Sequence, residues 1–214
     1  MQPLRNYLKD QMILYVFVSV LFVVGVVFGS LMVNALSLDQ QQELGRYLGH
    51  FFSTVDQGGV SGESAFWDTA MGHVKWIAII WILGLSVVGL PFILVLDFMK
   101  GVLVGFTVGY FVGQYSWKGL LFALVSVAPQ NIVVIPGIII SSVAAIGFSL
   151  YMLRNRVLTQ RRGQIKQPFV SYSALTLTMA VAMVGIALFE AWVSPVMMRW
   201  VAPMLLESVA MVRI

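Results

Sequence analysis

The longest apolar run of the chain constrains its fold more than any other feature. Residues 119–153 contain no charged side chain, and as one straight helix they would extend about 52 Å, at about 1.5 Å per residue. The hydrocarbon core of a bilayer is only about 30 Å thick. The run therefore exceeds the length of one crossing, and we expect it to break.

Composition assigns the chain to the membrane. Hydrophobic residues make up 59% of the 214 residues and charged residues only 10%, against about 25% charged residues in soluble proteins. Several windows exceed the 18 apolar residues that indicate a membrane-spanning helix. The sequence therefore predicts an all-α polytopic membrane protein.

Basic residues indicate the topology. Of the thirteen Lys and Arg residues, five lie in one short segment, which is typical of a cytoplasmic loop. We interpret this loop, 154–168, as a topology signal, with anionic-lipid contacts as the alternative, and we expect no nucleic-acid partner. The five residues are Arg154, Arg156, Arg161, Arg162 and Lys166.

We predict about five transmembrane helices, with the N-terminus inside and the C-terminus outside. Arg5 and Lys9 precede the first span, which favours an inside N-terminus. Residues 37–73 contain five acidic residues and one Lys or Arg, which suits an outer loop, and the tail 195–214 is expected on the outer surface. The predicted spans are 12–36, 74–96, 98–117, 132–153 and 169–193.

This topology leaves one net crossing for residues 119–153. The surplus must form a half-helix, about 119–128, that is either re-entrant or interfacial. The break is predicted at Pro129–Asn131, because Pro129 has no backbone N–H and disfavours helix at the preceding residue. Broken backbone at membrane depth must be buried or line a cavity. The residues assigned to the break or to a cavity are Pro129, Gln130, Asn131, Pro136 and Gly137.

Glycines predict close helix packing. The stretch "GVLVGFTVGYFVG" places Gly101, Gly105, Gly109 and Gly113 at four-residue intervals, on one face of a helix. Small residues at this spacing let helices approach closely in membranes. Gly25 and Gly29 form a second, shorter face. We expect these faces to hold the bundle, or a homodimer, together.

The outer segments predict a partner surface. In "LDQQQELGRYLGHFF" the apolar residues recur at helical spacing, which indicates a short amphipathic helix on the membrane surface or against a partner. The candidate partner surface combines this helix with the tail. Its residues are Leu44, Leu48, Phe51, Arg199, Trp200 and Glu207.

The sequence offers little catalytic chemistry. The chain has no cysteine and two histidines, His50 and His73, neither of which has a metal-site spacing. No nucleotide-binding P-loop is present. Glu190 is the one candidate for an intramembrane acid, and we interpret it as a solvated carboxylate at the outer rim. We expect neither enzymatic activity nor a cofactor or metal.

Several stretches resemble the stage II sporulation protein M family. They are "LYVFVSVLFVVGVVFGSLMVNAL", "GVLVGFTVGYFVG", "APQNIVVIPGIIISS" and "AIGFSLYMLR". The resemblance implies a multi-pass protein of the bacterial cell membrane, at the sporulation septum and in the engulfing membrane. It implies a non-enzymatic scaffold that works with stage II sporulation proteins P and D, which cut peptidoglycan. The alternative is a transporter or permease-like subunit that handles a lipid or cell-wall precursor.

Overall fold

Helices make up almost all of the part of the chain that the structure describes, which is a computed structural model covering residues 2–56, 62–154 and 166–212. Side chains are described for 11–50, 63, 65–154 and 166–198. No strand occurs in these ranges. The elements are α1 (Gln2–Met32), η1 (Val33–Ala35), α2 (Leu38–Asp56), α3 (Gly62–Gly84), α4 (Gly89–Ser126), α5 (Ala128–Met152) and α6 (Lys166–Val212).

Within the described residues, four helical stretches are long and apolar enough to cross a membrane. They are Gln11–Ala35, Gly89–Ser126, Ala128–Met152 and Lys166–Met198. The all-α polytopic class is therefore confirmed. Helix α3 is not among these four, because its first half is polar, and the total of five crossings and their orientation stay predictions.

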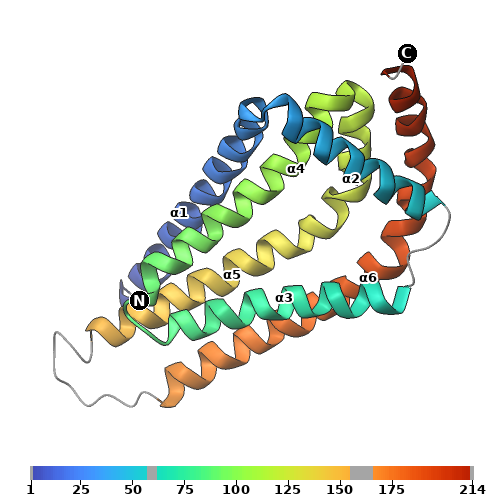
Figure 1. Ribbon diagram of the computed structural model, residues 1–214. Coiled ribbons are helices and arrows are strands. Elements are labelled where there is room, and N and C mark those ends of the chain that lie inside the picture. The colour runs from blue at the N-terminus through green and yellow to red at the C-terminus, as the bar shows by residue number, and fades with distance from the viewer. Residues whose placement is uncertain (1, 57–61, 155–165, 213–214) are drawn as a thin grey trace.

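Five helices form the bundle, and α2 crosses one end of it (Figure 1). Helices α1 and α4 run parallel, since Gly25 faces Phe98 and Gly29 faces Val102. Helices α3 and α6 run antiparallel, with α5 in contact with both. We call the end that carries α2 and Ser116 the α2 end. The end with residues 85–88, the last residue of α5 and the first residue of α6 is the opposite end.

One predicted boundary is wrong. The expected span 74–96 is interrupted by a turn at residues 85–88, with α3 ending at Gly84 and α4 beginning at Gly89. Short-range hydrogen bonds close this turn, including Gly89 N–H to the Ser86 carbonyl at 3.1 Å. A Cβ at Gly89 would overlap the carbonyl of Leu83. Only glycine fits this close approach, so the apolar stretch turns instead of continuing as one helix.

The break in the long apolar run lies at Val127, two residues before the predicted Pro129–Asn131, and a fold-back at Ser116 precedes the run. Helix α4 folds back at Ser116, whose φ of 50° lies in the left-handed region. Its second part, residues 117–126, packs against its first part through the ring pair Phe111–Phe122, 4.9 Å apart. A second irregularity is at Val127, and α5 begins at Ala128, not at residue 132. Pro129 therefore belongs to the first turn of α5, where the missing N–H needs no partner.

Helix α6 is longer than the predicted span 169–193. It continues as one helix to Val212 and includes Pro195 and Pro203, so the predicted tail is not a separate segment. At about 1.5 Å per residue its 47 residues extend about 70 Å, more than twice the thickness of a hydrocarbon core. Figure 1 shows α6 changing direction towards the α2 end in its last part.

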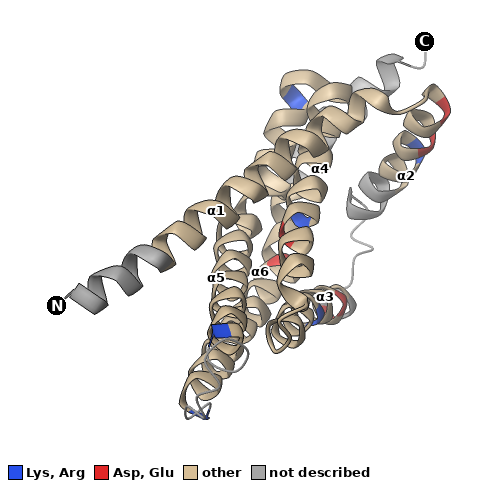
Figure 2. Ribbon diagram, turned by 90° about the vertical axis from the view of Figure 1, so that its left-hand side faces the viewer, with Lys and Arg blue, Asp and Glu red and all other residues tan. Residues whose placement is uncertain are grey.

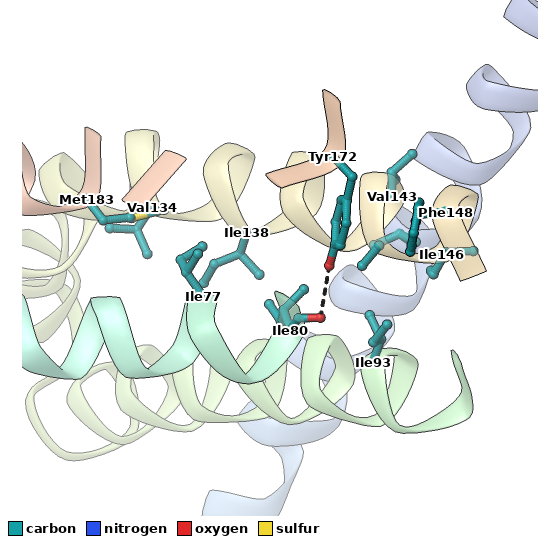
Figure 3. Packing of buried hydrophobic residues seen from close by; sticks show 12 residues of the cluster. Ile77, Ile80, Ile93, Val134, Ile138, Val143, Ile146, Phe148, Tyr172 and Met183 are labelled. Carbon is teal, nitrogen blue, oxygen red and sulfur yellow. Dashed lines mark hydrogen bonds between the residues drawn. The ribbon is translucent and has the colours of Figure 1, made fainter. Parts of the chain in front are cut away.

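The core lies where α3, α4, α5 and α6 meet (Figure 3). Tyr172 of α6 stacks on Phe148 of α5, with ring centroids 5.0 Å apart. Its hydroxyl donates to the carbonyl of Trp81 at 3.0 Å and lies 3.4 Å from that of Ile80. Helices in lipid gain no hydrophobic driving force from one another, so close packing and such hydrogen bonds stabilise the bundle.

Candidate functional site

The glycine faces of α1 and α4 meet in one interface, which we call the glycine seam. A Cβ added to Gly101 would overlap the carbonyl of Phe22, and one added to Gly105 would overlap that of Val26. At Gly109 it would lie 2.8 Å from the Ser30 Cα. The two backbones therefore touch directly, and no side chain fits between them.

The second glycine face completes the seam. Side chains at Gly25 and Gly29 would overlap the carbonyls of Phe98 and Val102. Gly113 lies at the margin, since its nearest neighbour is a Val33 methyl at 3.9 Å. The seam lies within one chain, so a homodimer would need another surface.

Local sequence explains how α2 begins. The backbone N–H of Gln40 donates to the Ser37 hydroxyl at 3.3 Å, and the Ser37 N–H donates to the Gln40 side-chain oxygen at 3.0 Å. This reciprocal pair is a capping box of the form Ser-x-x-Gln. It fixes the start of α2 directly after η1, so α2 leaves α1 at a defined angle.

Helix α2 packs against α6 and is also bound to α4. The Tyr110 hydroxyl of α4 donates to the carbonyl of Gln41 at 3.2 Å, and Gln114 donates to the Gln41 side chain at 3.4 Å. Leu48 packs on the cluster of Phe111 and Phe122. One face of α2 is therefore bound to the fold-back of α4.

The opposite face of α2 points away from the bundle. Its exposed residues mix both charges with an aromatic ring: Gln42, Glu43, Arg46, Tyr47 and His50. Tyr47 is 76% exposed. Of the predicted partner surface, Leu48 is used internally and Leu44 is half-buried. The side chains of Phe51, Arg199, Trp200 and Glu207 lie outside the described ones.

The predicted break borders an apolar hollow of about 300 Å³. Asn131 lines it and donates to the Val127 carbonyl at 2.7 Å, which satisfies a backbone acceptor at the irregular residue. Gln130 is half-buried and does not line the hollow. Helix α5 continues through Pro136, and Gly137 packs against the Met183 methyl. The other residues of the hollow are Val104, Val108, Leu120, Ala123, Leu124, Val127, Ala128, Ile132 and Ile135.

A charged side chain that the sequence placed at a membrane boundary is in the interior. Asp97 of α4 has no exposed surface. One carboxylate oxygen accepts a hydrogen bond from the Ser142 hydroxyl of α5 at 2.8 Å, and the other has no hydrogen-bond partner among the described residues. Ionisable residues inside a membrane are costly and mark functional positions by default.

Lys100 follows Asp97 by one turn of α4, and we call Asp97, Lys100, His73 and Glu190 the interior polar cluster. Lys100 lies above the Trp76 ring, 5.3 Å from its centroid. His73 of α3 contacts Glu190 of α6 at 3.0 Å, and their side chains are only 14% and 12% exposed. Figure 2 shows basic and acidic positions inside the otherwise tan bundle. The interpretation of Glu190 as a solvated rim carboxylate is therefore wrong, since this carboxylate is largely buried and paired with His73.

The sequence contained a signal for this cluster. Gly89, followed by Pro91, is typical of a helix start, and it would have placed Asp97 and Lys100 inside a helix. The predicted span 74–96 instead joins residues 85–96 to the preceding helix, which leaves Asp97 between two spans and Lys100 at the start of the next.

The remaining predicted residues lie apart from the cluster. Arg154 is exposed at the end of α5, and Lys166 is exposed at the start of α6. Arg156, Arg161 and Arg162 lie outside the described residues. His50 is exposed on α2. Within residues 2–56, 62–154 and 166–212, no three His, Asp or Glu side chains gather as metal ligands.

Comparison with known proteins supplies the family. No curated protein and no solved structure matches the chain significantly. The sequence model of one family, stage II sporulation protein M, matches residues 18–195. This range begins in α1 and ends in α6, so it includes the glycine seam, the fold-back of α4 and the interior polar cluster. The chain therefore belongs to the stage II sporulation protein M family.

Proposed function

We propose that the protein is a non-enzymatic membrane scaffold that recruits and organises peptidoglycan-degrading enzymes at the septum during engulfment. Membership of the family implies a role in sporulation engulfment, and the family is generally regarded as non-catalytic. The partners that the resemblance implies are stage II sporulation proteins P and D. Recruitment, septal location and these partners are the proposed part.

The observation that carries the proposal is that one face of α2 is bound to the bundle while the other face is exposed. Its inner face is bound to α4 through Tyr110, Gln114 and Leu48. Its outer face presents Glu43, Tyr47 and other exposed residues. Under the predicted topology this face lies outside the cell membrane, where peptidoglycan is cut. Exposed tyrosine and arginine, here Tyr47 and Arg46, are residue types that protein interfaces favour.

A docking role needs this helix to be held in place. A partner that binds a rigidly held surface does not lose affinity to ordering that surface. The capping box at Ser37 and the Tyr110 hydrogen bond give α2 a fixed start and a fixed orientation. The seam then joins this end of the bundle to the rest of the chain through two helices whose backbones touch.

The test uses fluorescent fusions of proteins P and D in an endospore-forming bacterium. Deletion of the gene should disperse both enzymes and block septal thinning. The double variant Glu43→Lys/Tyr47→Ala should accumulate normally and also disperse them. The matched control, Lys166→Glu/Gln167→Ala, changes two exposed residues at the opposite end and should keep both enzymes at the septum. Septal enzymes in the deletion strain would refute the proposal.

The hollow beside Asn131 favours a second candidate, the handling of a lipid. Its lining is apolar apart from this one amide, which suits an acyl chain. Ala123→Phe would fill the hollow. Normal enzyme location combined with failed engulfment in this variant would favour lipid handling over scaffolding.

A further inference from the structure

A cavity inside the bundle borders the interior polar cluster. It measures about 300 Å³ and lies between α3, α4, α5 and α6. At about 1.5 Å per residue, Lys100 is about 16 Å along α4 from Gly89. The lining residues are Thr69, Gly72, His73, Trp76, Ile77, Lys100, Ile138 and Met183.

Among the described residues, the cavity has two basic side chains in its lining and one carboxylate that acts on both. Lys100 and His73 both line it, and Glu190 is the carboxylate that acts on both of them. Asp97 is bound to Ser142 and does not line the cavity. Among the described residues, the one contact found for the Lys100 ammonium is the face of the Trp76 ring. One carboxylate therefore serves two basic side chains.

An unpaired hydrogen-bond donor lies in the same wall. The Trp76 indole nitrogen is buried and has no hydrogen-bond partner among the described residues. An indole N–H can only donate, and leaving such a group unpaired in the interior is unfavourable. The missing partner must therefore be an acceptor. A nearby cation and an unpaired donor together favour an acceptor that carries negative charge.

We propose that this cavity binds an anionic phosphate group. Lysine binds phosphate as a point charge, and Thr69 and Trp76, whose side chains each carry a hydrogen-bond donor, also line the cavity. The volume is at the lower end for small-molecule sites, which suits a phosphate with a short alcohol but not a whole phospholipid. Ile138 and Met183 supply an apolar wall for the carbon atoms next to the phosphate. The source is a lipid headgroup or free phosphate, and the binding does not depend on enzyme recruitment.

Native mass spectrometry of the purified full chain tests the proposal. The probes are phosphatidylglycerol and a diacylglycerol with the same acyl chains, which has no phosphate. We expect phosphatidylglycerol to be retained and the diacylglycerol to be lost. Lys100→Met should weaken retention about tenfold or more, because a hydrogen bond to a charged group is removed. The matched control Lys75→Met removes an exposed lysine of α3 and should change nothing.

Two further variants separate binding from folding. Trp76→Phe keeps the ring and removes the N–H, so retention should fall about two- to tenfold. Glu190→Gln removes the negative charge that acts on Lys100, so retention should rise, which general damage to the fold would not produce.

Equal retention by Lys100→Met and Lys75→Met, or equal retention of both lipids, would overturn the proposal. Displacement of the lipid by excess inorganic phosphate would identify free phosphate as a ligand; no displacement would assign the site to the lipid headgroup.

Discussion

The glycine seam at Gly105 and the cavity at Lys100 lie on different faces of α4 and differ in what fills the space between helices. At the seam, Gly105 and the Val26 backbone touch, and no side chain could be added. At the cluster, Lys100 and Trp76 border a cavity of about 300 Å³. One helix therefore contacts α1 without a gap and contacts α3 around an open site. The difference indicates that the seam holds the bundle together while the cluster is available for binding.

The largest expected effect comes from filling the seam. Gly105→Leu should prevent assembly of the bundle, because the new side chain would overlap the Val26 carbonyl and separate α1 from α4. Size-exclusion chromatography of the fluorescently tagged protein should show aggregate or no protein. Gly185→Leu is the control, since nothing lies within 4 Å of a Cβ there, and it should give the wild-type peak. A wild-type peak from Gly105→Leu would refute the direct contact of α1 and α4 at the seam.

An intermediate effect is expected at Asp97. Asp97→Ala should lower the free energy of unfolding by about 1–3 kcal/mol, because it leaves the Ser142 hydroxyl unpaired in the interior. Denaturation with SDS in mixed micelles measures this change. A double-mutant cycle with Ser142→Ala should give a coupling energy of about 0.6–1.7 kcal/mol, the range for hydrogen bonds between membrane helices.

The control for this cycle is Thr178→Ala, which removes an exposed hydroxyl bonded to its own helix. It should change the free energy of unfolding by less than about 0.5 kcal/mol. A coupling energy of zero between Asp97 and Ser142 would mean that the interior of the cluster does not depend on this hydrogen bond.

The smallest effect is expected at the fold-back of α4. Ser116 has φ of 50° and ψ of −127°, a conformation that costs a non-glycine residue about 1–3 kcal/mol. Glycine adopts it freely but loses more entropy on folding, about 0.5–1 kcal/mol. Ser116→Gly should therefore raise the melting temperature slightly, and Ser116→Val should lower it. A lower melting temperature for Ser116→Gly would argue against a strained backbone at this turn.

Sequence reasoning reached the fold class and the family, because both depend on features that survive errors in helix boundaries. Low charge and long apolar runs indicate a polytopic membrane protein wherever the helices end. Glycines at four-residue spacing also stay on one face of α4 wherever the helix begins or ends. The partner of that face, α1, was suggested by Gly25 and Gly29, but contact between the two faces needs the parallel arrangement that only the structure supplies.

Prediction of the interior polar cluster depends on one boundary, which Gly89 and Pro91 indicate but which composition does not. Residues 85–88 are apolar enough to continue a span, so composition gave no reason to stop there. The stop depends on Gly89, whose missing side chain admits the Leu83 carbonyl. Once α4 begins there, Asp97 and Lys100 move to the interior. Contact between His73 and Glu190, 117 residues apart, also requires the pairing of α3 with α6.

Cysteine labelling tests the contrast between seam and cluster most directly, since the chain has no cysteine of its own. Thr69→Cys places a thiol in the cavity wall, and Val102→Cys places one in the buried seam. Each variant, in nanodiscs, is treated with a negatively charged and a positively charged methanethiosulfonate reagent. We predict that Thr69→Cys reacts faster with the negative reagent, because Lys100 lines the cavity, and that Val102→Cys reacts with neither. Equal protection of both thiols, or faster reaction of Val102→Cys, would contradict the account.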